Sequence, residues 1–139
     1  ARAFGGDSHL SVGGLALQPD RGAVLTGTFD QPFDADPGPG STMLSPNDGS
    51  GFLLELAPGG ALARARAFGR SVPRARGLCA PQGLAVAPGG ALVVVGSVVG
   101  EVHFAAGESA TTVSARTDRD AFLHWLPPRP ARVAGEGRE

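Results

Sequence analysis

The chain has 139 residues, 12 basic and 13 acidic side chains, and a formal net charge of −1 with its histidines neutral. This length allows one ordinary domain. The near-zero charge without a basic cluster argues against a nucleic-acid surface, because phosphate binding needs several convergent Lys or Arg side chains.

The remaining composition favours an all-β, antiparallel fold. A single cysteine excludes an intrachain disulfide and a Cys/His zinc cluster. No apolar run reaches the ~18–20 residues of a membrane span, and we expect no signal peptide because the N-terminus lacks an apolar core segment. The 22 glycines and 12 prolines, beside 42% hydrophobic residues, indicate many turns between short apolar runs.

In chain order, the first predicted elements are two hairpins. Residues 15–26 form the first, and residues 52–66 form the second around the turn Ala-Pro-Gly-Gly at 57–60. Such a turn is tight because proline pre-sets φ and glycine accepts φ > 0. Residues 62–68 and 120–126 would pass as helices on propensity, but their alternation and hairpin context favour strands. Two hairpins give the four strands of a propeller blade.

The second half of the chain repeats the first. Residues 14–19 (GLALQP) return as 83–88 (GLAVAP) at an offset of 69, and residues 48–53 return as 118–123 at an offset of 70. The triplet Ala-Phe-Gly at 3–5 matches the same triplet at 67–69, so the chain begins partway through a unit. Internal repetition at this period is typical of repeat architectures.

The repeat divides the chain into four parts. We expect the end of a preceding unit at residues 1–6, unit 1 at 7–69, unit 2 at 70–126, and a disordered tail at 127–139. Unit 2 is degenerate at its end, because prolines at 127, 128 and 130 fall where its last strand would begin.

The order of motifs in unit 1 resembles a known family. The motifs are TGTF at 26–29, FDADPGPG at 33–40, residues 48–56, Gly60, and RAFG at 66–69. This series resembles the bacterial seven-bladed β-propeller repeat family (SBBP-type repeats), found in secreted and surface proteins of GC-rich bacteria. The resemblance covers residues 1–126, and unit 2 departs from it where VHFAAG at 102–107 replaces the Asp-Pro-Gly segment. It implies propeller-blade-like repeats and an extracellular or cell-surface location.

Two blades do not close a ring of ~4–8 blades. The apolar faces of each unit are buried only when neighbouring units cover them. We therefore expect neighbouring blades in the same protein or self-association of copies. A fragment of a longer array is favoured over a smaller fold. Specificity is then expected in exposed loops at 30–50 and 98–120.

Asp34 and Asp36, in a Pro-Gly-rich loop, are the candidates for a metal. Alternating carboxylates offer the oxygen ligands that Ca²⁺ prefers, although aspartates in such loops also form turns by accepting backbone hydrogen bonds. The matching loop of unit 2 has no carboxylate. A Ca²⁺-stabilised β module is therefore an alternative, and we expect no metal or other cofactor.

Residues 6–10 (GDSHL) resemble the opening of the GDSL esterases, in which serine is the nucleophile. Ser8 would need a histidine base held by a carboxylate, and Asp120 and His124 are the candidates. The chain shows no βαβ alternation of the kind that family requires. A serine esterase is thus a second alternative, and we expect no catalytic residues.

Four further features have structural interpretations. His124 shares a face with Phe122 and Leu126 and should be packed, whereas Trp125 points the other way and should be partly buried between units. Cys79 should be a small buried apolar residue. The arginines at 64, 66, 70, 74 and 76 should form a solvated face, with an acidic partner or glycan as the functional alternative. The sequence predicts a non-enzymatic scaffold or binding module whose protein or glycan ligand is unknown.

Overall fold

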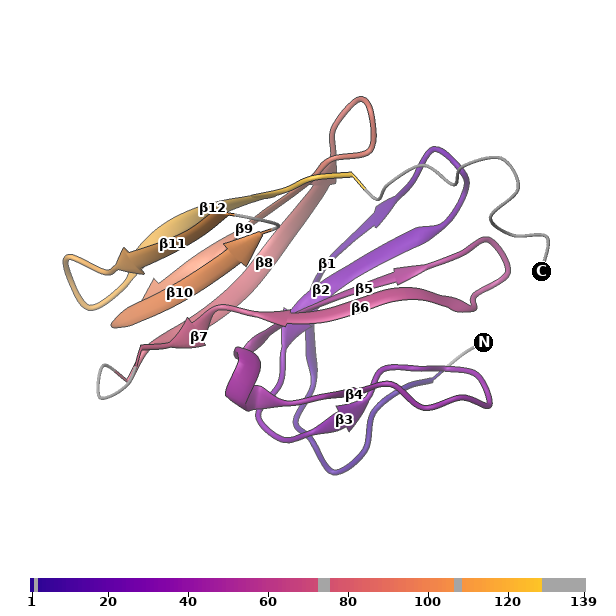
Figure 1. Cartoon of the computed structure of the whole chain (residues 1–139), viewed down its shortest axis with the longest axis horizontal. Coiled ribbons are helices and arrows are strands. Elements are labelled where there is room, and N and C mark those ends of the chain that lie inside the picture. Colours follow the sequence, from indigo (N-terminus) through magenta and orange to yellow (C-terminus); the bar gives the residue numbers. More distant parts are fainter. Residues whose placement is uncertain (2, 73–75, 107–108, 129–139) are drawn as a thin grey trace.

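A computed structural model of the chain describes residues 1, 3–72, 76–106 and 109–128. The fold is all-β and its sheets are antiparallel, as predicted (Figure 1). The strands are β1 (Ser11–Leu17), β2 (Ala23–Thr28), β3 (Phe33–Asp34), β4 (Met43–Leu44), β5 (Gly51–Leu56), β6 (Leu62–Phe68), β7 (Arg70–Ser71), β8 (Leu78–Val86), β9 (Leu92–Val99), β10 (Glu101–Ala106), β11 (Ser109–Ser114) and β12 (Asp120–Leu126), with one short 3₁₀ helix, η1 (Pro46–Asp48).

The first sheet has the strand order β1-β2-β5-β6, and the second has the order β8-β9-β12. The hairpins predicted at residues 15–26 and 52–66 are confirmed, and residues 62–68 and 120–126 are strands. A fourth strand of the second sheet would fall at residues 129–139, which lie outside the described part of the chain, as does most of the tail expected to be disordered.

The two sheets share local details that follow the sequence repeat. The β1–β2 register shifts between Val12 and Gly14, and the β8–β9 register shifts between Pro81 and Gly83, at an offset of 69. The β1–β2 and β8–β9 turns are also alike, because the Gln18 N–H donates to the Gly22 carbonyl oxygen and the Ala87 N–H donates to the Ala91 carbonyl oxygen, each at 2.8 Å. Equivalent positions in the two sheets can therefore be compared one by one.

Each sheet carries a small flap between its second and third strands. In the first sheet the flap is the pair β3–β4, and Gly5 bridges to Asp34. In the second sheet the flap is the hairpin β10–β11, and Arg70 of β7 pairs with His103. The chain that leaves one unit thus pairs with the flap of the next.

The segments 30–50 and 98–120 are not simply exposed loops, so that prediction was wrong. Residues 98–120 include the whole β10–β11 hairpin, and residues 30–50 bury Phe33, Ala35 and Leu44. The β10–β11 strands form because β-branched and aromatic residues, such as Val102, Phe104 and Val113, pack against the core.

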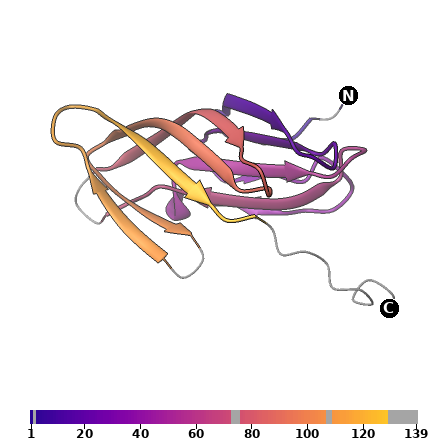
Figure 2. The same ribbon diagram turned by 90° about the horizontal axis from the view of Figure 1, so that it is seen from above.

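The main core lies between the two sheets. Val24 and Leu53 of the first sheet pack in one cluster with residues of the second sheet, among them Leu92, Val94 and Leu126. In Figures 1 and 2, β8 runs alongside β1 where the sheets meet. A second cluster fixes the β3–β4 flap on the far face of the first sheet, where the Phe29 and Phe33 rings meet edge to face with centroids 5.0 Å apart.

Candidate functional site

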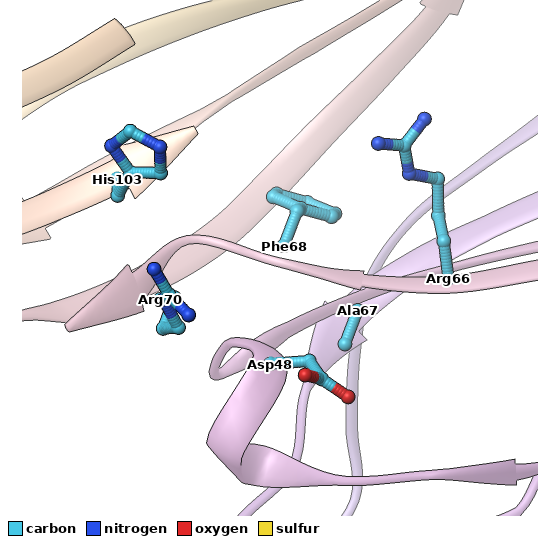
Figure 3. Close-up of a pocket in the computed structure, with 6 residues that line it drawn as sticks. All are labelled: Asp48, Arg66, Ala67, Phe68, Arg70 and His103. Atoms are coloured by element: carbon cyan, nitrogen blue, oxygen red, sulfur yellow. The ribbon is translucent and has the colours of Figure 1, made fainter. Parts of the chain in front are cut away.

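A pocket of about 280 Å³ opens where the end of the first sheet meets the β10–β11 flap, and we call it the seam pocket (Figure 3). The end of β6, the short strand β7, strand β10 and helix η1 bring its walls together. Figure 3 shows Arg70 and His103 on one side of Phe68 and Arg66 on the other, with Asp48 below. The lining residues are Asp48, Arg66, Ala67, Phe68, Arg70 and His103.

The predicted solvated arginine face is only partly correct. Arg64 is largely buried and donates through Nε to Glu55, whose side chain is 1% exposed and also accepts from Gln18 Nε2 at 3.0 Å. Burial of Arg66 lowers its pKa, with a smaller effect from the neighbouring Arg64. Arg70 and Arg76 are exposed, and residue 74 lies outside the described part of the chain. Two of these arginines therefore belong to the interface between the sheets.

Four residues of the first sheet form the face that the second sheet covers, which we call the seam face: Val24, Thr26, Leu53 and Glu55. Each of them is at most 1% exposed. The sequence repeat maps them onto Val93, Val95, Leu123 and Trp125 of the second sheet, which we call the open face. Leu123 is 65% exposed and Trp125 is 55% exposed, so the predicted burial of Trp125 between units was wrong within this chain.

The first sheet has an exposed apolar patch on its opposite side. Leu15 is 61% exposed and Leu17 is 72% exposed, and we call these two the leading patch. Their equivalents in the second sheet, Leu84 and Val86, pack against the core between the sheets. Where the two sheets meet, the seam face packs against the side of the second sheet that carries Leu84 and Val86. The equivalents of these two surfaces, the open face and the leading patch, are both exposed.

Ser8 and His9 meet on Asp30 and not on the residues predicted for an esterase. The Ser8 hydroxyl donates to Asp30 Oδ1 at 3.4 Å and accepts from the Gln31 backbone N–H at 3.1 Å. His9 Nδ1 lies 2.9 Å from Asp30 Oδ2, and the backbone N–H of His9 lowers the pKa of this carboxyl. A neighbouring cavity of about 360 Å³ is lined by both His9 and Asp30. Both the imidazole and the serine hydroxyl are bonded to the Asp30 carboxylate. In a catalytic triad the serine hydroxyl is bonded to the imidazole instead.

The other predicted members of the esterase site have different partners. Asp120 accepts from the Arg116 backbone N–H and the Thr117 hydroxyl. His124 is packed, as predicted, with its ring centroid 4.9 Å from that of Phe104 and 5.8 Å from that of Phe68. Burial lowers the pKa of His124 to about 4. Among the described hydrogen bonds of Ser8, none reaches Asp120 or His124.

Asp34 and Asp36 direct oxygen atoms to the backbone of their own loop. Asp34 Oδ1 accepts from the N–H groups of Asp36 and Thr42, at 3.0 and 2.9 Å, and these bonds lower its pKa. Asp36 Oδ1 accepts from the Gly38 N–H at 2.7 Å. Within the described residues, no three His, Cys, Asp or Glu side chains form a group able to hold a metal ion. The two aspartates act as turn formers.

Cys79 is buried, as predicted, with 1% of its surface exposed. Burial raises the pKa of its thiol to about 12, so the thiolate that a nucleophile or metal ligand requires is scarce at neutral pH. Cys79 also restricts position 69 to glycine, because a Cβ there would lie 2.4 Å from Cys79 Cβ and φ is +74°. This thiol is a packing group beside the seam.

Comparisons with known proteins add no relative. No protein-family model, no curated protein and no solved structure matches this chain. In the part of the chain that the structure describes, no helix is long and apolar enough to cross a bilayer.

Sequence reasoning missed the seam pocket. Asp48, Phe68, Arg70 and His103 are 55 residues apart at their extremes and carry no local motif. The sequence carried no direct signal for it, because the pocket depends on the pairing of Arg70 in β7 with His103 in β10, 33 residues later in the chain.

Proposed function

We propose that the chain is a non-enzymatic β-propeller repeat module of the SBBP type, acting as scaffold and binding surface in a secreted or cell-surface bacterial protein. The observation that carries this proposal is that the open face and the leading patch are exposed, whereas their sequence equivalents are buried where the two sheets meet. Leu123 and Leu17, 65% and 72% exposed, have as sequence equivalents Leu53, which is fully buried, and Val86, which packs on the core between the sheets.

Burial favours a continuing stack. Removing apolar side chains from water stabilises by about 25 cal/mol per Å² of surface, and contiguous exposed apolar patches mark interaction sites. The contact inside the chain joins a seam face to the side of the sheet that carries the leading-patch equivalents. The same contact at the open face joins it to the leading patch of another unit, either in the same protein or in a second copy, and extends the stack head to tail.

The test is the solution molar mass of the chain by light scattering across a concentration series. We expect a mass above that of one chain, rising with concentration, and a single-chain mass for Leu123→Glu. Met43→Glu is the matched control, because Met43 is 59% exposed on the β3–β4 flap and lies outside both surfaces. A single-chain mass for the unchanged protein at every concentration contradicts the proposal, as does equal loss of assembly in the control.

The non-enzymatic part has its own test. Ser8 shares its carboxylate with His9, so its hydroxyl donates its proton toward Asp30 Oδ1 and not toward an imidazole base. We expect the unchanged protein and Ser8→Ala to hydrolyse p-nitrophenyl acetate at the same background rate. Ser8-dependent turnover would instead support an esterase.

A further inference from the structure

The seam pocket combines several hydrogen-bond donors with one acidic side chain. Two guanidinium groups and one imidazole line it, and Asp48 is the one carboxylate among its described lining residues. Within the described residues, no ion pair or side-chain hydrogen bond holds the exposed Arg70 guanidinium. A guanidinium presents a planar fork of donors that matches a carboxylate with two parallel hydrogen bonds. Arg70 is therefore available to an anionic group of a ligand.

His103 is oriented beside Arg70. Its Nδ1 lies 3.1 Å from the Thr112 hydroxyl across the β10–β11 hairpin, and pairing with β7 places it next to Arg70 in the sheet. This contact fixes the ring and leaves the other ring nitrogen for the pocket. The pocket thus has two neighbouring groups that can donate hydrogen bonds to one anion (Figure 3).

Asp48 adds a hydrogen-bond acceptor to the donors of the pocket. No ion pair joins it to Arg70 among the described residues, although both line the same cavity. A carboxylate at this place repels a simple anion but accepts hydrogen bonds from hydroxyl groups. Ala67 and Phe68, the latter 3% exposed and packed in the core, complete the lining. At about 280 Å³ the cavity lies just below the range of ~300–1,000 Å³ for ligand sites, which suits a single small unit.

We infer that the seam pocket binds a carboxylated sugar, a hexuronate unit of an acidic glycan, with Arg70 and His103 on the carboxylate and Asp48 on the ring hydroxyls. The inference rests on the binding role proposed above and names its ligand class. It does not rest on stacking, because the pocket lies at the junction inside one chain and not on the open face.

The test is calorimetric titration of the full chain with galacturonate and with a short oligogalacturonate, and with galactose and inorganic phosphate as probes lacking one of the two features. We expect binding of the uronates, with galactose and phosphate each weaker by about tenfold or more. Arg70→Gln should weaken uronate binding by about tenfold. Arg119→Gln is the matched control, because this exposed arginine in the β11–β12 turn makes the same charge change elsewhere.

Asp48→Asn separates a sugar site from a general anion site. It should weaken uronate binding and strengthen phosphate binding, since it replaces one of the two acceptor oxygens by an amide donor and removes a repelling charge. Equal binding of galactose, tighter binding of phosphate than of uronate, or equal losses in Arg70→Gln and Arg119→Gln would each overturn the inference, as would no binding at all.

The same titrations on Leu123→Glu distinguish the two proposals. If this variant no longer assembles but still binds uronate, the pocket binds its ligand independently of stacking. Assembly of the unchanged protein without uronate binding leaves the stacking role standing and removes the glycan.

Discussion

The seam face and the open face occupy equivalent positions in the two repeat units. Their exposure to solvent is the reverse of what their polarity alone would predict. Thr26 and Glu55 on the seam face are fully or almost fully buried, whereas their equivalents Val95 and Trp125 are 41% and 55% exposed. The more polar face is covered and the more apolar face lies open to water.

This difference teaches that stacking, and not side-chain hydrophobicity, decides which residues are buried here. The buried polar face is tolerated because Glu55 has Arg64 and Gln18 as partners. The open face needs no such partners: at the positions equivalent to Gln18 and Arg64 the sequence has alanines, Ala87 and residue 134. A face of Val, Leu and Trp without charges is suited to a neighbour.

The largest expected contrast comes from one leucine on each face. Leu53→Ala should lower the free energy of unfolding by about 3 kcal/mol, because it empties a fully buried site, whereas Leu123→Ala should change it by less than about 0.5 kcal/mol. Urea denaturation of both variants at a concentration at which the chain is a monomer measures this. Equal losses would mean that the two faces are covered alike.

The close approach of the sheets gives the second contrast. A Cβ on Gly13 would lie 2.2 Å from the Pro81 carbonyl oxygen of β8, whereas a Cβ on Gly83 would meet only the Val95 side chain, at 2.9 Å. Gly13→Ala should cost about 2–3 kcal/mol, because backbone must move, and Gly83→Ala should cost less, because a side chain can. Denaturation midpoints compare the two. The account of the β1–β8 contact fails if Gly83→Ala is the more damaging change.

Acid should weaken the seam through His124. Burial lowers its pKa in the folded protein to about 4, below the ordinary value of 6.5. The unfolded state therefore binds the proton first as pH falls, so stability decreases below about pH 6.5, by about 2 kcal/mol between pH 7 and pH 5. His124→Leu should remove this loss, since Leu54 is the equivalent residue in unit 1. It should also stabilise the protein at pH 7, because the buried Nε2 lacks a described partner.

The control for this pH dependence is His9→Gln. The side chain of His9 is 93% exposed, so this variant should keep the acid sensitivity of the unchanged protein. Denaturation at pH 7 and pH 5 settles the comparison, and an unchanged pH dependence in His124→Leu would show that the loss arises elsewhere.

The sequence predicted the parts of this molecule that depend on local pattern. The hairpins, the strands at 62–68 and 120–126, and the packing of Cys79 and His124 follow from alternation, from Ala-Pro-Gly-Gly turns and from the repeat. The β10–β11 hairpin was missed because VHFAAG departs from the pattern of unit 1, although β10 takes the place of β3.

Long-range pairing could not be predicted in the same way. Glu55 and Arg64 face each other only because Leu56 pairs with Leu62 across a tight turn, and their burial depends on a sheet that begins at Leu78, 23 and 14 residues later in the chain. The exposure of Trp125 likewise depends on what stands beyond the second sheet and not on residues near it in sequence.

The most direct test of head-to-tail stacking is the mass of a mixture. Leu17→Glu removes only the leading patch and Leu123→Glu removes only the open face, so each variant alone lacks one half of the contact. An equimolar mixture retains one intact pair of surfaces, and light scattering should give the mass of a dimer that does not grow with concentration. A mixture that stays at the mass of one chain, or assembly by either variant alone, would contradict the account.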